Sequence, residues 1–129
     1  RARANDGSTD QGEADVLPYN DGGSERFVSL DSRLINLDAT AVTRGLTTSN
    51  DLADLVSLGV SDYDGFTPTL FDQSGNGNNA TQTTASLQPQ IVDAGSLVTL
   101  NSKAAIDFSS SKLLKSSFTR LSRLSRGSL

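Results

Sequence analysis

Apolar residues in this chain occur in short groups that are separated by polar, turn-forming residues, which is typical of short β-strands. The groups recur closely along the chain, and Gly95 marks a turn between two of them. This rhythm predicts a mainly β fold, an antiparallel β-sandwich or jelly roll, either complete or partial. The segments that favour strands are 26–30, 34–37, 66–71, 91–92, 97–100 and 104–108.

One segment follows a helical period instead. Its apolar positions recur at the spacing of one helix face: Leu52, Leu55, Val56 and Leu58. Ser49 or Asn50 is a candidate N-cap, Asp51 suits the first turn, and Gly59 stands where helices end. The sequence therefore predicts a single short helix.

The pattern divides the chain into three parts. Residues 1–25 are polar and predict an N-terminal arm or an edge strand, with disorder as the alternative. Residues 26–118 carry the strand groups of the β-sandwich domain, and residues 119–129 form a basic C-terminal tail. Pro68 has no N–H to donate, so its strand should lie at an edge or use an unpaired position.

The most informative stretch is Leu-Phe-Asp-Gln-Ser-Gly-Asn-Gly-Asn-Asn-Ala-Thr-Gln, residues 70–82. Glycine reaches positive φ without a steric cost, and Asp and Asn side chains can bond nearby backbone N–H groups. The stretch therefore predicts a strand, a rigid polar corner and a second strand. The candidate site residues of this motif loop are Asp72, Gln73, Ser74, Gly75, Asn76, Gly77, Asn78 and Asn79.

These residues resemble the "YDQSGNGNxATQ" signature of concanavalin-like (LamG-type) jelly-roll domains. Such domains occur in phage and prophage tail and head proteins, and a related form occurs in family-54 arabinofuranosidases. The resemblance continues in residues 88–92, 95–98 and 103–108, and an arginine-rich opening matches in residues 1–16. Leu70-Phe71 stands where the family usually has Trp-Tyr, and the chain departs from the family after Phe108.

The missing residue types exclude several chemistries. The chain has no Cys, which removes disulfides, thiolate zinc ligands and a thiol nucleophile. It has no His, which removes the usual general base and a serine triad that relies on it. No apolar run approaches the ~20 residues of a membrane span. Met is absent even at position 1, so we expect a processed product or a segment of a longer chain.

Charge is distributed unevenly along the chain. Residues 1–102 hold five Arg against fourteen acids, whereas residues 103–129 hold six basic residues against one acid. Arg120, Arg123 and Arg126 are a candidate docking tail for an acidic neighbouring subunit or for phosphates. The alternative is a solvated terminus with incidental leucines. No aromatic residues interleave with these arginines, which argues against nucleic acid.

Acids are the remaining candidates for chemistry. Oxygen ligands for Ca²⁺ are available near the motif, in Asp62, Asp64, Asp72, Asn76 and Asn78. The alternative is that Asp72 and Asn76 brace their own loop by hydrogen bonds. A second acidic cluster comprises Asp6, Asp10, Glu13 and Asp15. The sequence pairs no two carboxylates for glycoside hydrolysis, and the resemblance implies that the arabinofuranosidase acids lie beyond this chain. We therefore expect no catalytic residue, no metal centre and no obligatory cofactor.

The resemblance implies a non-enzymatic structural protein of a phage virion, in a capsid decoration, a head fibre or a tail fibre. Its lectin-like sandwich would serve assembly and adhesion to surface glycans, in the virion or outside cells. Expected partners are other virion subunits or copies of itself in a homo-oligomer, together with glycans and without a membrane. Alternatives are a carbohydrate-binding module and a fragment of an arabinofuranosidase-like glycoside hydrolase. Because a partial sandwich leaves strand edges unpaired, we expect a partner chain to complete it.

Overall fold

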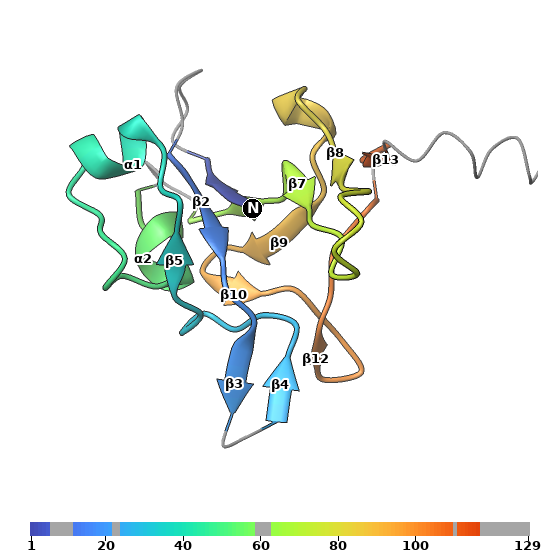
Figure 1. The fold of residues 1–129 in the computed structure, drawn as a ribbon, viewed down its shortest axis with the longest axis horizontal. Helices are drawn as coiled ribbons and strands as arrows, with labels where there is room; N and C mark the ends of the chain where they lie inside the picture. Colours follow the sequence, from blue (N-terminus) through green and yellow to red (C-terminus); the bar gives the residue numbers. More distant parts are fainter. Residues whose placement is uncertain (6–11, 22–23, 59–62, 110, 117–129) are drawn as a thin grey trace, which may run out of the picture.

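The computed structural model describes residues 1–5, 12–21, 24–58, 63–109 and 111–116. Within these ranges the fold is mainly β with antiparallel sheets, as the sequence predicted, and it is consistent with a β-sandwich. Figure 1 shows the α-helices on one side and the strands of a small second sheet on the other.

The main sheet has six strands in the order β10-β9-β6-β1-β2-β5. All five pairings are antiparallel. In sequence order its strands are β1 (Ala2–Ala4), β2 (Glu13–Val16), β5 (Leu34–Ile35), β6 (Gly65–Phe66), β9 (Gln90–Asp93) and β10 (Ser96–Leu97).

Three smaller sheets accompany it in the part of the chain that the structure describes. One has the order β13-β8-β7, and two are hairpins, β3-β4 and β11-β12. The strands are β3 (Tyr19–Asp21), β4 (Ser24–Arg26), β7 (Thr69–Leu70), β8 (Ala80–Thr81), β11 (Thr99–Leu100), β12 (Lys103–Ala104) and β13 (Lys115–Ser116). Pro68 lies between β6 and β7, where the chain leaves the main sheet, and its carbonyl accepts from Gln82 N–H at 2.8 Å.

The first residues lie inside the sheet rather than in an arm or an edge strand. β1 is flanked by β2 and β6, and Ala2 and Ala4 are buried. The buried Arg3 between them points to the other face, where its Nε donates to Gln88 Oε1 at 2.6 Å. Polar composition concealed this strand, because small alanines alternate with an arginine whose donors are satisfied inside the protein.

The described residues contain two short α-helices, where the sequence predicted one. α2 (Leu52–Val56) is the expected helix, and its N-cap is Asp51 rather than Ser49 or Asn50. Asp51 and Asp54 form a reciprocal capping box. α1 (Ala39–Thr43) was not predicted, and it begins at Asp38, whose side chain accepts from Ala41 N–H. A 3-10 turn, η1 (Ala85–Leu87), precedes β9.

The predicted strand over 26–30 is wrong for residues 27–30. Ser32 N–H donates to Ser29 C=O, and Ala53 N–H of α2 donates to Leu30 C=O. The backbone carbonyls of this segment thus accept hydrogen bonds from a turn and from the start of a helix. They are therefore not used to pair with a neighbouring strand. Its predecessor β4 ends at Arg26.

The core lies between the helices and one face of the main sheet. Ala4 pairs with Gly65 in the register of β1 and β6, so the two share this face. A Cβ on Gly65 would lie 2.9 Å from Val56 Cγ1 of α2, which places the helix directly over the sheet there. The buried apolar side chains are Ala2, Ala4, Ala14, Val28, Leu34, Ala41, Leu46, Leu52, Leu55, Val56, Ile91 and Val92.

Both α-helices have five residues. Within the described ranges, therefore, no helix has the length and apolar character needed to cross a membrane.

Candidate functional site

The motif loop connects two neighbouring antiparallel strands, β7 and β8, in which Leu70 pairs with Ala80. Its central acid is Asp72, whose carboxylate accepts from Ser74 N–H at 2.9 Å, Ser74 Oγ–H at 2.7 Å and Asn78 N–H at 3.2 Å. These hydrogen bonds, that from the Ser74 side chain first, hold the pKa of Asp72 below its ordinary value of 3.8. The carboxylate is therefore ionised at neutral pH and is engaged with its own loop.

Other side-chain oxygens of the motif loop also accept hydrogen bonds from its backbone N–H groups. Asn79 Oδ1 accepts from Asp72 N–H at 2.9 Å, and Ser74 Oγ accepts from Asn76 N–H at 3.3 Å. Gly75 and Gly77 have φ of 86° and 74°, in the left-handed region that favours glycine. The side-chain brace of the loop comes from Asp72, Ser74 and Asn79, whereas Asn76 takes part through its backbone N–H.

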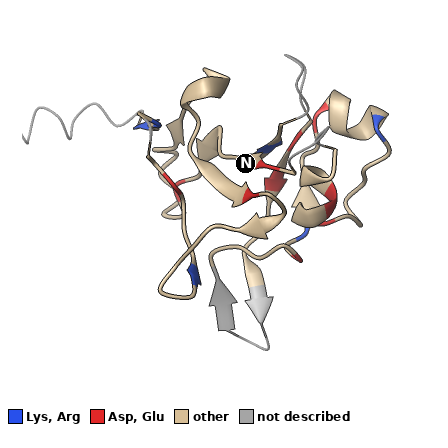
Figure 2. Ribbon diagram, turned by 180° about the vertical axis from the view of Figure 1, so that it is seen from behind, with Lys and Arg blue, Asp and Glu red and all other residues tan. Residues whose placement is uncertain are grey.

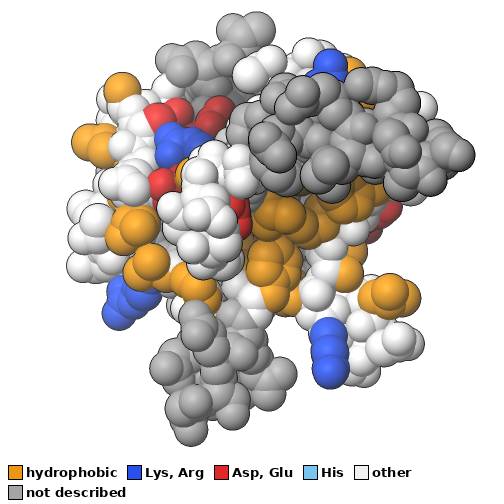
Figure 3. Space-filling model, turned by 45° about the vertical axis from the view of Figure 1, so that its right-hand side comes forward, with side chains coloured by type: hydrophobic (Ala, Val, Ile, Leu, Met, Phe, Trp, Pro, Cys, Tyr) orange, Lys and Arg blue, Asp and Glu red, His pale blue; other side chains and the backbone are white. Residues whose placement is uncertain are grey.

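A pocket of about 650 Å³ lies beside the motif loop, on the part of the helix-bearing sheet face that α2 does not reach. That face continues from Gly65 to Thr67 and from Ala14 to Val16, because side chains two residues apart along a strand point the same way. Figure 3 shows apolar side chains gathered on one face of the molecule. The lining residues are Arg1, Ala2, Val16, Pro18, Phe27, Val28, Thr67, Thr69, Leu70, Phe71, Gln73 and Ile91.

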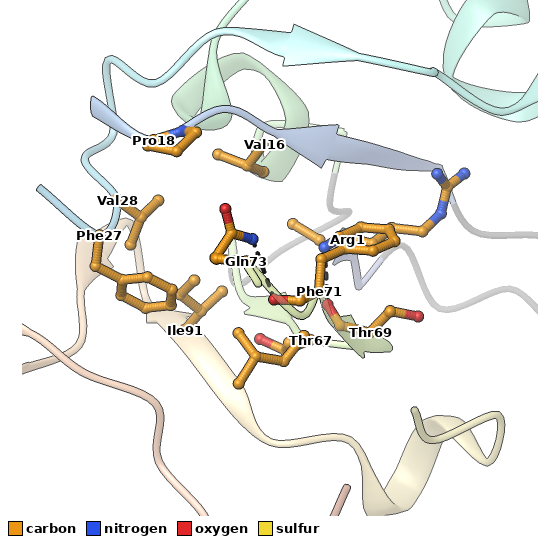
Figure 4. A pocket seen from close by; sticks show the side chains of 12 residues that line it. Arg1, Val16, Pro18, Phe27, Val28, Thr67, Thr69, Phe71, Gln73 and Ile91 are labelled. Atoms are coloured by element: carbon orange, nitrogen blue, oxygen red, sulfur yellow. Dashed lines mark hydrogen bonds between the residues drawn. The ribbon is translucent and has the colours of Figure 1, made fainter. Parts of the chain in front are cut away.

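The rim of this pocket is apolar and exposed. The exposed fractions are 47% for Phe27, 38% for Phe71 and 37% for Leu70. In Figure 4 Phe27 and Phe71 lie at two sides of the opening, and the Gln73 side chain lies between them. Gln73 Nε2 donates to Phe71 C=O at 3.1 Å, so the motif loop holds both residues at the rim.

Polar groups in the pocket are few. Thr67 is buried, and its Oγ1 is, among the described side chains, a buried polar atom without a hydrogen-bond partner. The Arg1 guanidinium binds Glu13 Oε1 and Asp15 Oδ1 at 2.8 and 3.1 Å, and neither acid lines the pocket. The guanidinium charge of Arg1 is thereby balanced by acids outside the cavity, and the cavity walls are mainly apolar.

The second acidic cluster proposed from the sequence is only partly described. Glu13 and Asp15 bind Arg1 as above, while Asp6 and Asp10 lie outside the described residues. Of the acids near the motif, Asp62 also lies outside them, and Asp64 Oδ1 accepts from Ala94 N–H at 2.9 Å. In the described part of the chain no group of three or more acids is arranged to hold a metal ion.

Basic residues do not form a patch on the described part of the molecule. Figure 2 shows the Lys and Arg positions spread over separate points of the ribbon. Arg120, Arg123 and Arg126, the candidate docking tail, lie outside the described residues.

Sequence reasoning found the motif loop but missed the pocket beside it. Phe27, Thr67 and Ile91 come from three separate segments, and only the fold brings them to one cavity. A usable signal was Phe71, a large apolar residue directly before a polar corner.

Comparisons of the chain with protein-family models, with curated proteins and with solved structures found no match.

Proposed function

We propose that this chain is a non-enzymatic structural module of a phage virion, in a capsid decoration, a head fibre or a tail fibre. The observation that carries the proposal is the use of Asp72, the central acid of the motif, as a loop brace with three hydrogen-bond donors. A group engaged in this way serves architecture, and the resemblance of the motif to phage jelly-roll domains then gives the class of protein.

Assembly into a virion requires surfaces whose burial in a subunit contact is energetically favourable, and exposed apolar side chains provide such surface. Outside the pocket several large apolar side chains remain exposed: Tyr63, Leu100 and Phe108, with 69% exposure for Leu100. Leu100 ends β11 of the β11-β12 hairpin, and Phe108 follows Asp107, which forms a bridge with Gln90 of β9. Burying exposed apolar side chains of this size would favour contacts with further subunits, including copies of this chain.

Sedimentation velocity and native mass spectrometry of the full chain test the assembly. We expect concentration-dependent oligomers that are weakened by L100S or F108S, because both substitutions remove apolar area from the surface. V42S is the matched control, since Val42 is also exposed but lies on α1. A chain that stays monomeric and well folded at every concentration, with no affinity for virion subunits, would contradict the proposal.

A carbohydrate-binding module is the second candidate, and the rim of the pocket favours it. Phe27 and Phe71 offer ring faces for a sugar, and the amide of Gln73 lies between them. Binding of immobilised glycans that is lost in F71A but retained in F108A would support this function over assembly.

A third candidate, an arabinofuranosidase-like fragment, differs from the virion module and the carbohydrate-binding module in that it would have hydrolytic activity. Release of arabinose from a synthetic arabinofuranoside by the purified chain would overturn the non-enzymatic proposal.

A further inference from the structure

The pocket has an apolar lining that the described residues leave open to solvent. Its exposed rim of Phe27, Leu70 and Phe71 adds to an apolar patch of the kind that soluble proteins usually cover. The few polar groups in its walls offer little to a hydrophilic occupant. An aliphatic or aromatic side chain fits this chemistry best.

The register of the small sheet brings the end of β13 close to this pocket. Leu70 of the pocket wall pairs with Ala80, and Ala80 pairs with Ser116. Two strand spacings separate Ser116 from Leu70, which is about 10 Å. Since both pairings are antiparallel, β13 runs in the same direction as β7. β13 therefore points toward the end of the sheet at which β7 leads into Phe71 and the motif loop.

Residues 117–129 have the composition that the pocket requires. They supply four large apolar side chains, Phe118, Leu121, Leu124 and Leu129, spaced by serines and arginines. Extended, this segment reaches up to about 40 Å, several times the separation from the pocket wall. Its three arginines stand against a remainder of the chain with net negative charge, so electrostatic attraction favours its return to the domain.

We propose that residues 117–129 of the same chain fold back past β8 and fill the pocket with their apolar side chains. Occupancy from the same chain is favoured because a tether this short holds the segment at an effective concentration in the millimolar range. The leucines of the tail then replace water against Phe27, Phe71 and Ile91, and the arginines between them stay at the surface. This inference does not rest on the proposed virion function.

The absence of cysteine allows a clean test on the full chain. A spin label on S125C should broaden the methyl resonances of pocket residues Val16, Val28 and Ile91 more strongly than those of Val42 on α1. A second variant, L121S/L124S with the same label, should lose this selective broadening while the domain stays folded. L100S with the label is the matched control and should retain it.

Three outcomes would overturn the proposal. Pocket methyls that are no more broadened than Val42 would leave the cavity to a partner protein or a glycan. Selective broadening seen only when labelled and unlabelled chains are mixed would assign the occupant to a neighbouring copy. Broadening that L121S/L124S leaves unchanged would show that the leucines do not seat the tail. The sedimentation experiment tests oligomer formation and does not depend on these results. The proposed assembly and the proposed docking of the tail can therefore be rejected separately.

Discussion

Arg3 and Gln88 are joined by a 2.6 Å hydrogen bond across 85 positions of sequence, with both side chains buried. Gln88 Nε2 in turn donates to Gln82 C=O at 2.8 Å, and the Arg3 guanidinium lies 4.7 Å from the Phe66 ring centroid. The bond ties β1 to the segment between β8 and β9. A buried guanidinium is tolerable there because the fold supplies it with acceptors and a ring face.

Removing the Gln88 acceptor should show how much the protein's stability depends on the hydrogen bond from Arg3. Q88L is expected to lower the free energy of unfolding by about 2–3 kcal/mol, because it leaves a donor of a buried charged group without its partner. Chemical denaturation followed by circular dichroism measures this. Q73L, at an exposed glutamine, should change the stability by less than about 0.5 kcal/mol. Equal losses in the two variants would contradict the role of the buried bond.

The brace in the motif loop predicts a pH dependence. The pKa of Asp72 is lower in the folded protein than its ordinary value of 3.8, chiefly because of the Ser74 hydroxyl. The stabilisation by its carboxylate is therefore fully present above about pH 4 and is lost as the pH falls through the lowered folded pKa. D72N should lower the melting temperature at neutral pH, and its difference from the unmodified protein should shrink in acid.

Melting curves between about pH 2 and pH 7 test this expectation. D31N is the control, since Asp31 is an exposed acid in a different turn. A D72N deficit that stays constant across this range would argue against the ionised brace.

Close packing of α2 on the sheet predicts a strong effect at Gly65. G65A should destabilise the protein by about 1–3 kcal/mol through overpacking. The added Cβ would lie 2.9 Å from Val56 Cγ1 and 3.2 Å from Val92. In the double variant G65A/V56A the loss should be less than the sum of the single losses, because truncating Val56 relieves the contact. Additive unfolding free energies would place the strain elsewhere.

Substitutions at the N-terminus of α2 can distinguish Asp51 from Ser49 as the N-cap residue. D51A should cost about 1 kcal/mol, since Asp51 Oδ1 accepts from Asp54 N–H at 3.0 Å and closes the capping box. Ser49, which the sequence offered as an alternative cap, has an exposed side chain, and S49A should be nearly neutral. Thermal unfolding of the two variants gives the comparison, and a larger loss in S49A would assign the cap to Ser49.

Local interactions explain which features could be predicted. The corner between β7 and β8 is readable because its bonds join residues at most seven positions apart, and because Gly75 and Gly77 mark its positive φ values. The helix α2 is readable from an apolar period that continues over several positions. α1 is too short to show such a period, and only Asp38 signals its start.

The sequence by itself determined the mainly β class, the polar corner, the helix α2 and the exclusion of cysteine and histidine chemistry. These features depend on residue types and on contacts within a few positions. Tertiary structure decided that β1 lies inside the main sheet, that Arg3 meets Gln88, and that Phe27, Thr67 and Ile91 share a cavity with Phe71. Strand order and cavities depend on pairings between distant segments, and each pairing is selected by the burial and hydrogen bonding of the whole sheet. The pattern of apolar and polar residues in one strand does not specify its neighbour.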